Sequence, residues 1–180
     1  MFKKLILFVF LLFFGINCAS ANCLTYDNEK YCLAFSRKNK IGYLNEYVRK
    51  NETVHNWTKM IGVYYYEIDA DAKTYTKNFS ERIRSQENQM LITYLQSVNL
   101  VSFDIVPRGS KKYFEYDVFR FEDLNNSAII GLQFTKRYKF QDTKESMKAT
   151  LYKSVEKSRR YENLLINTPM PKIVKKNIGE

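Results

Sequence analysis

Apolar and polar residues alternate along much of the chain with the period of a β-strand. Residues 57–68 are apolar on both faces near their middle, which predicts a central strand that is covered on each side. Residues 24–27 and 31–36 flank a short polar turn and are expected to form a hairpin, and residues 41–48 alternate weakly. The first half of the chain is therefore expected to supply strands of one sheet.

Three further strands are expected in the second half of the chain. They cover residues 101–106, 112–121 and 127–140, and the last of these shows the cleanest alternation. The pattern slips at residues 119–121, which predicts a bulge there. The connections between these strands are short, so we expect an antiparallel meander.

Helical spacing of apolar residues occurs in two segments. Residues 74–98 predict a helix of about six turns. Residues 143–166 predict a second helix, which begins with a variant capping box at Asp142 and Glu145 and ends before Pro169. The expected apolar stripe of the second helix consists of Met147, Leu151, Val155, Tyr161 or Glu162, and Leu165.

This order of elements predicts an α+β domain. Its antiparallel sheet would contain the hairpin, the central strand and a C-terminal three-strand meander, packed with two amphipathic helices. We expect one domain over residues 22–168, which is long enough to bury a core. Residues 169–180 are expected to form a mobile, basic, proline-containing tail.

The N-terminal residues have the organisation of a secretory signal peptide. Two lysines precede an apolar run over residues 5–14, which is short for a membrane span, and the small-residue sequence Ala19-Ser20-Ala21 follows. We therefore expect cleavage after Ala21 and a periplasmic or secreted chain without a stable membrane span. Lipoprotein processing at Cys18 is the alternative, and it is disfavoured because Asn17, rather than a small residue, precedes that cysteine.

Two cysteines remain after this cleavage, Cys23 and Cys32. An even pair in an exported chain predicts a disulfide, and this one would stabilise the fold by about 2–3 kcal/mol. The spacing is not that of a redox-active C-x-x-C motif.

The chain is basic, with a formal charge of +10. Residues 1–21 contain two lysines and no acid, so the cleaved chain would carry +8. In an exported protein this excess favours an anionic envelope surface or an acidic protein as the partner, rather than nucleic acid. A generally basic surface without a specific partner accounts for the same excess and is the more common case.

A short polar segment, Glu52-Thr53-x-x-Asn56-Trp57-Thr58, resembles a motif in small, mostly uncharacterised exported proteins of Gram-negative bacteria. Arg159-Arg160-Tyr161-Glu162, followed by two prolines, is similar to their C-terminal end. The order of strands and helices is also loosely similar to the Mog1/PsbP-like fold. The resemblance implies export and this fold, and it implies no catalytic residues.

The chain lacks the residues that most catalytic and metal sites require. His55 is the only histidine, and one histidine with two paired cysteines does not make a usual zinc site. A Ser-His-Asp triad would depend on His55, and the chain has no G-x-S-x-G, P-loop or G-x-G-x-x-G motif. The acidic pairs Asp69/Asp71 and Glu122/Asp123 fall in expected turns. We therefore favour a protein without catalytic activity, cofactor or metal.

Binding is the favoured class of function, and two kinds of site remain open. Trp57 and Tyr65, with His55 nearby, could line a ligand site, although aromatic residues on a central strand more often fill a core. Lys153, Lys157 and Arg160 could contact an anionic partner, although basic residues on a helix more often form a solvated face.

Two functions follow from these candidate sites. The first is an exported, non-catalytic envelope protein that binds a protein or an anionic partner, of which an immunity-type protein is one form. The second is an accessory hydrolase or small-ligand carrier with a pocket near Trp57.

Overall fold

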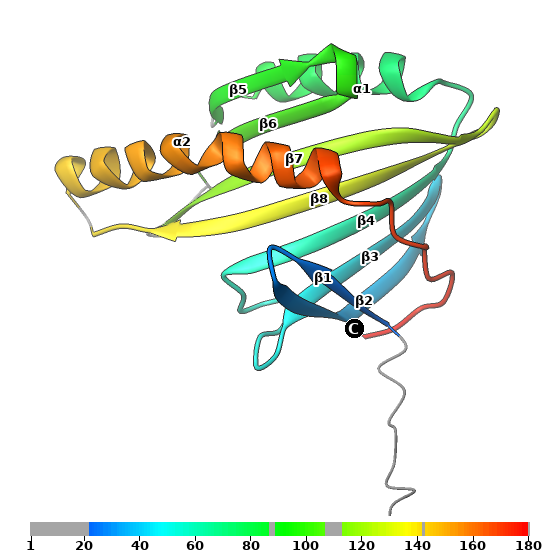
Figure 1. Cartoon of the computed structure of the whole chain (residues 1–180), viewed down its shortest axis with the longest axis horizontal. Coiled ribbons are helices and arrows are strands. Elements are labelled where there is room, and N and C mark those ends of the chain that lie inside the picture. The colour runs from blue at the N-terminus through cyan, green and yellow to red at the C-terminus, as the bar shows by residue number, and fades with distance from the viewer. Residues whose placement is uncertain (1–21, 87–88, 107–112, 142, 180) are drawn as a thin grey trace, which may run out of the picture.

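The computed structural model describes residues 22–86, 89–106, 113–141 and 143–179. Within these residues one antiparallel sheet of eight strands carries two helices, which confirms the expected α+β class (Figure 1). Neither of these helices is long and apolar enough to cross a lipid bilayer. The expected signal peptide over residues 1–21, with Cys18, lies outside the described residues.

The order of the strands across the sheet is β1-β2-β3-β4-β8-β7-β6-β5, so two meanders meet where β4 pairs with β8. The predicted central strand is therefore confirmed, because β4 has β3 on one side and β8 on the other. The strands are β1 Cys23–Tyr26, β2 Glu29–Asn39, β3 Gly42–Arg49, β4 Lys59–Glu67, β5 Gln89–Leu95, β6 Leu100–Ile105, β7 Tyr113–Asn125 and β8 Ala128–Lys139. The helices are α1 Ala72–Arg84, the 3-10 turn η1 Gln96–Val98, and α2 Lys144–Asn167.

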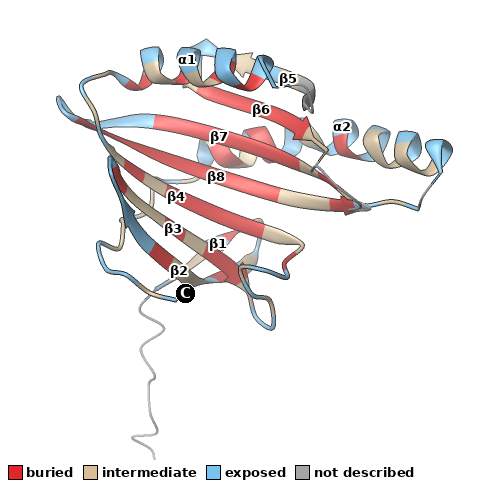
Figure 2. Cartoon of the chain, turned by 180° about the vertical axis from the view of Figure 1, so that it is seen from behind, coloured by how far each residue is buried: buried red, intermediate tan, exposed pale blue. Residues whose placement is uncertain are grey.

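Each face of the sheet has its own apolar cluster, because successive side chains of a strand point to opposite sides. The face that carries α2, here the α2 face, buries Ile61 and Val63 of β4. The other, the α1 face, holds Tyr64 and Tyr66 against α1. Figure 2 shows buried residues along the middle of β4, β8, β7 and β6. Apolar packing on both sides of β4 agrees with its sequence pattern.

The long helix expected over residues 74–98 is wrong in its second half. Helix α1 begins at an N-cap, where the Thr74 N–H donates to the Asp71 Oδ1 at 2.6 Å, and it ends near Ser85. The chain then forms β5, which pairs with β6. Tyr94 lies at helical spacing from the α1 residues by coincidence, and strand pairing decides its conformation instead.

The prediction of a bulge at residues 119–121 is also wrong. Pairing of β7 with β8 is regular there, and the register shifts only between Asp123 and Asn125. The alternation of apolar and polar residues is interrupted because the polar Arg120 is buried on the α2 face. Its sequence neighbours, Phe119 and Phe121, point to the α1 face. The Arg120 guanidinium donates to the carbonyl oxygens of Leu165, Ile166 and Thr168 at the C-terminal end of α2.

Helix α2 is confirmed, but its buried stripe and its N-cap differ from the expected ones. The N-cap is Thr143, whose Oγ1 accepts from the Ser146 N–H, and Asp142 lies outside the described residues. Val155 is 43 % exposed, although it was expected in the stripe. The buried positions of the helix are Ser154, Tyr161, Glu162 and Leu165.

The two ends of the described chain meet at β2. The Cys23–Cys32 disulfide joins β1 to β2, as expected, and is consistent with export. Residues 169–179 lie against the sheet rather than apart from it, and they run from α2 towards β2 (Figure 1). There Ser36 and Ile178 exchange backbone hydrogen bonds of 2.8 Å, and the Val174 N–H donates to Asn45 Oδ1 at 2.7 Å.

Candidate functional site

The residues of the E-T-x-x-N-W-T segment build the loop between β3 and β4. Glu52 accepts hydrogen bonds from Arg49 and from the backbone and side chain of Thr58. Burial opposes ionisation of Glu52, but these hydrogen bonds prevail and lower its pKa to about 2. Thr53 and Asn56 exchange backbone hydrogen bonds of 3.1 Å across the same loop. The segment therefore has a structural role in holding the entry into β4.

Trp57 and Tyr65 do not form one aromatic platform. Trp57 is 6 % exposed, packs with Met60, and lies under the guanidinium of Arg137, 3.5 Å from the ring centroid. Tyr65 lies on the opposite face of β4 from Met60, since the two differ by an odd number of positions. The Nζ of Lys175 lies 4.0 Å from the centroid of the Tyr65 ring. His55 is exposed in the loop.

The basic residues predicted on α2 have two different environments. Arg160 forms an ion pair with Asp27 in the turn between β1 and β2. Lys153 and Lys157 are exposed, and no ion pair of the described residues includes either of them. Of the three predicted residues, these two lysines are therefore the ones without an ion pair among the described residues.

The outer surface of α2 also exposes large apolar side chains. Tyr152 is 64 % exposed, and Val155 lies one turn further along. We call this surface, together with the neighbouring Lys148, Lys153 and Lys157, the α2 ridge. Along the whole of α2, six basic side chains are exposed, whereas only two acidic side chains, Glu145 and Glu156, are exposed.

A cavity of about 250 Å³ lies between α2 and the β5–β6 hairpin. Its polar wall includes Ser102 and Asp104 of β6 and Tyr116 of β7, all of which are buried. Burial raises the pKa of Asp104 to about 6, against a hydrogen bond from Ser154 Oγ of 2.8 Å that favours the carboxylate. The residues that line the cavity are Ile92, Thr93, Ser102, Phe103, Asp104, Tyr116, Val155 and Ser158.

A second buried carboxylate, that of Glu162, contacts Ser102 of this wall. Glu162 of α2 is 7 % exposed, and its Oε1 accepts a hydrogen bond of 2.5 Å from Ser102 Oγ. The hydroxyl of Tyr116 lies 3.5 Å from the same oxygen. Glu162 and Asp104 thus share a buried region in which their hydrogen-bond partners are hydroxyl groups.

A third buried acid, Asp117, lies on the α1 face of β7. Its Oδ1 accepts hydrogen bonds from Gln133 Nε2, at 2.7 Å, and from Thr135 Oγ1 of the neighbouring strand. Burial is the largest cause that raises its pKa, to about 7, and the charge of Glu115 adds to it. None of the cavities described here is lined by Asp117, so this cluster is a buried network within the sheet.

Of the two acidic pairs considered for catalysis, Glu122/Asp123 lies in β7 rather than in the expected turn, and one acid of each pair, Asp71 and Asp123, caps the start of α1. Asp69, Asp71 and Asp123 surround a shallow cavity of about 410 Å³. Asp71 accepts from the Thr74 N–H, and Asp123 accepts from the Ala72 N–H at 2.7 Å. No group of three potential metal-binding side chains occurs among the residues that the structure describes.

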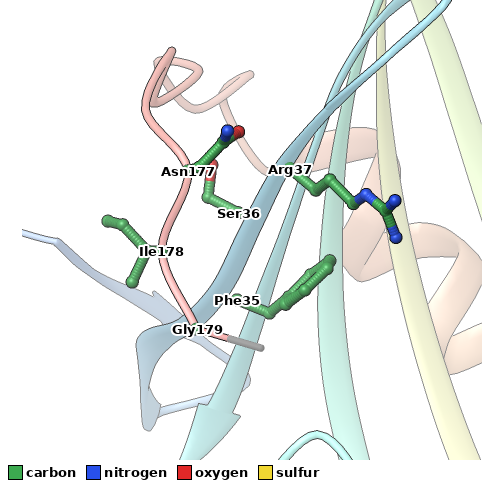
Figure 3. Close-up of a pocket in the computed structure, with 6 residues that line it drawn as sticks. All are labelled: Phe35, Ser36, Arg37, Asn177, Ile178 and Gly179. Atoms are coloured by element: carbon green, nitrogen blue, oxygen red, sulfur yellow. The ribbon is translucent and has the colours of Figure 1, made fainter.

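Two cavities flank the C-terminal segment. The larger, of about 730 Å³, lies where residues 177–179 meet β2 (Figure 3). Phe35 and Arg37 point away from the segment there, whereas Ser36 points towards it. The other, of about 190 Å³, is mainly apolar and lies beside Pro169 and Pro171. Neither has converging charged side chains, so the cavity at Asp104 is the stronger candidate.

The acidic cavity was not predicted from the sequence. Ser102 and Asp104 alternate with apolar residues in the expected strand, and this pattern is typical of a solvated face. A signal is nevertheless present on α2, where Ser154, Ser158 and Glu162 follow one another at helical spacing in line with Leu165. Polar residues on the buried side of a helix indicate a polar site beneath it.

A protein-family model matches residues 19–164, which is more than half of the chain. The family carries no description of a function. No curated protein and no solved structure matches the chain. The chain therefore belongs to this uncharacterised family.

Proposed function

We propose that this protein is an exported, non-catalytic binding protein that holds an acidic partner protein on the α2 ridge. The observation that carries the proposal is Tyr152, which is 64 % exposed on α2 and has the Nζ of Lys148 at 6.0 Å from its ring centroid. Exposed aromatic residues on well-ordered elements are typical anchors of protein interfaces. The lysines would steer an acidic surface towards this anchor.

Helix α1 offers a comparison that separates charge from shape. It is basic as well, with Lys73 and Lys77 exposed, but no large apolar side chain of α1 is among the exposed ones. A partner attracted by net charge alone would bind to both helices equally. A partner that requires the aromatic anchor would prefer α2.

An immunity-type protein that neutralises an acidic toxin is one specific form of this function. The alternative of a ligand pocket near Trp57 is not favoured, because Trp57 is buried and its ring is covered by Arg137. The α2 ridge therefore remains the best candidate surface for the favoured function.

A pull-down followed by affinity measurement tests this proposal. Oxidised chain 22–180 is immobilised, envelope extract is applied at moderate salt, and retained proteins are identified by mass spectrometry. We expect one acidic protein in stoichiometric amount. With that protein purified, Tyr152→Ala should weaken binding about tenfold or more, the equivalent of 1.4 kcal/mol.

The controls use paired charge reversals on the two helices. Lys153→Glu/Lys157→Glu should reduce both the association rate and its salt dependence, whereas Lys73→Glu/Lys77→Glu should change neither by more than about twofold. Equal effects of the two pairs, or retention of only heterogeneous material that salt removes, would show that the charge acts without a specific surface.

A further inference from the structure

The cavity beneath α2 is partly open, since the exposed Val155 lines it, and it has room for more than a water molecule. A buried water needs about 10–15 Å³, whereas this cavity measures about 250 Å³. Asp104, Ser102 and Tyr116 converge on it from neighbouring strands and are 2–3 % exposed. A cavity with a few converging buried polar groups has the organisation of a small-molecule site.

The two acids of this region, Asp104 and Glu162, are buried and form no ion pair among the described residues. A cation on this face of the sheet, Lys136, contacts Tyr138 and Tyr161 instead. The hydrogen bonds of the two acids come from Ser154, Ser102 and Tyr116, which are neutral. Buried carboxylates are ordinarily paired with a cation, because hydroxyl groups replace only part of the lost hydration.

A further buried residue, Tyr138, belongs to this neighbourhood. Tyr138 is 8 % exposed, and its hydroxyl lies close to the side chains of Ser154 and Tyr161. Burial is the largest cause that raises the pKa of Tyr138, and the nearby Tyr161 and Asp104 add to it, whereas a hydrogen bond with Ser154 lowers it. The polar network around Asp104 thus extends to Tyr138, and its two acids have no ion-pair partner among the described residues.

We infer that this cavity binds a small organic ammonium ion, with the charged nitrogen against Asp104 and the apolar part towards Val155. An ammonium group supplies the missing positive charge and donates up to three hydrogen bonds, which suit the carboxylate and the hydroxyls of Ser102 and Tyr116. A bare metal ion is a poorer occupant, because it needs more oxygen ligands than one carboxylate and two hydroxyls provide. The site goes beyond the partner surface proposed above, and Val155 is the one residue that the two share.

Three probes of matched shape test the charge requirement. They are phenethylammonium, 2-phenylethanol and phenylacetate, which are cationic, neutral and anionic at pH 7.5. Each is titrated into oxidised chain 22–180 and followed by amide chemical shifts. We expect saturable shifts at β6 and α2 with phenethylammonium, at least tenfold weaker binding of the alcohol, and no binding of phenylacetate.

Two variants and two controls test the position of the site. Asp104→Asn should weaken phenethylammonium binding at least tenfold, whereas Asp117→Asn, which neutralises a buried acid on the α1 face, should change it by less than about twofold. Val155→Trp should also abolish binding by filling the cavity from an exposed helix position, without altering either acid. Tyr152→Ala should leave probe binding unchanged, which separates this site from the proposed partner surface.

Several outcomes would overturn the inference. Equal binding of the three probes would show that charge plays no part. Absence of saturation by phenethylammonium in a folded chain would show that the cavity is not an ammonium site. Chemical shifts at Asp104 that calcium chloride alone reproduces would show a metal site instead.

Discussion

Replacement of Asp117 by asparagine should stabilise the protein at alkaline pH and leave it nearly unchanged in acid. Asparagine has almost the same shape, and its Oδ1 can accept the same hydrogen bonds from Gln133 and Thr135. The substitution therefore removes a buried charge while it keeps the packing. The expected effect follows from the pKa of Asp117 alone.

The magnitude follows from the difference in pKa between the folded and unfolded chains. Burial raises the pKa of Asp117 from 3.8 to about 7. The folded chain thus binds this proton more tightly than the unfolded chain, and the free energy of unfolding falls as pH rises between these two values. The full loss is about 4 kcal/mol above pH 7, and the asparagine variant does not undergo it.

Urea unfolding at pH 4 and pH 8 measures this effect, with the fluorescence of Trp57 as the probe because it is the only tryptophan and is buried. The variant should exceed the natural chain by up to about 4 kcal/mol at pH 8 and agree with it within about 1 kcal/mol at pH 4, with equal m-values. A stability difference that is the same at both pH values would refute the reasoning, since Asp117 would then titrate with an ordinary pKa.

Three other substitutions test the contacts that hold the fold together, each by urea unfolding. Arg120→Met should lower the free energy of unfolding by about 2–4 kcal/mol, because three carbonyl groups at the end of α2 lose their buried donor; a smaller loss than that of an exposed control, Arg82→Met, would contradict this. Cys23→Ser/Cys32→Ser should lose about 2–3 kcal/mol, and a reductant should lower the natural chain to the same level while leaving the variant unchanged. Gly42→Ala should lose about 2 kcal/mol or more, because φ is +153° and a Cβ would lie 1.7 Å from the Tyr65 carbonyl oxygen; a stability equal to that of the natural chain would contradict the β3–β4 register.

Local patterns account for the elements that were predicted correctly. The disulfide hairpin and the central strand depend on residues close in sequence, and Ile61 and Val63 alternate with Tyr64 and Tyr66 within one strand. These features follow from the strand period and from cysteine spacing. They require no knowledge of distant contacts.

The errors occur where distant contacts override a local pattern. Tyr94 continues a helical spacing, yet β6 pairs with its segment and makes it a strand. Arg120 interrupts an apolar run because the end of α2, remote in sequence, needs a donor there. Ser102 and Asp104 look like a solvated strand face, and only the position of α2 buries them. The candidate ligand site therefore could not be predicted from local sequence patterns, because it forms only when α2 packs on the sheet.

The junction between β4 and β8 also has a consequence for the kinetics of folding. Each meander can form by local hairpins, but Lys59 must pair with Lys136, which is 77 residues away, before the sheet is continuous. Until that step is complete, β4 and β8 each present an unpaired edge that another copy of the chain can join. The closing of this junction therefore sets both the speed of folding and the interval during which strand exchange between molecules can occur.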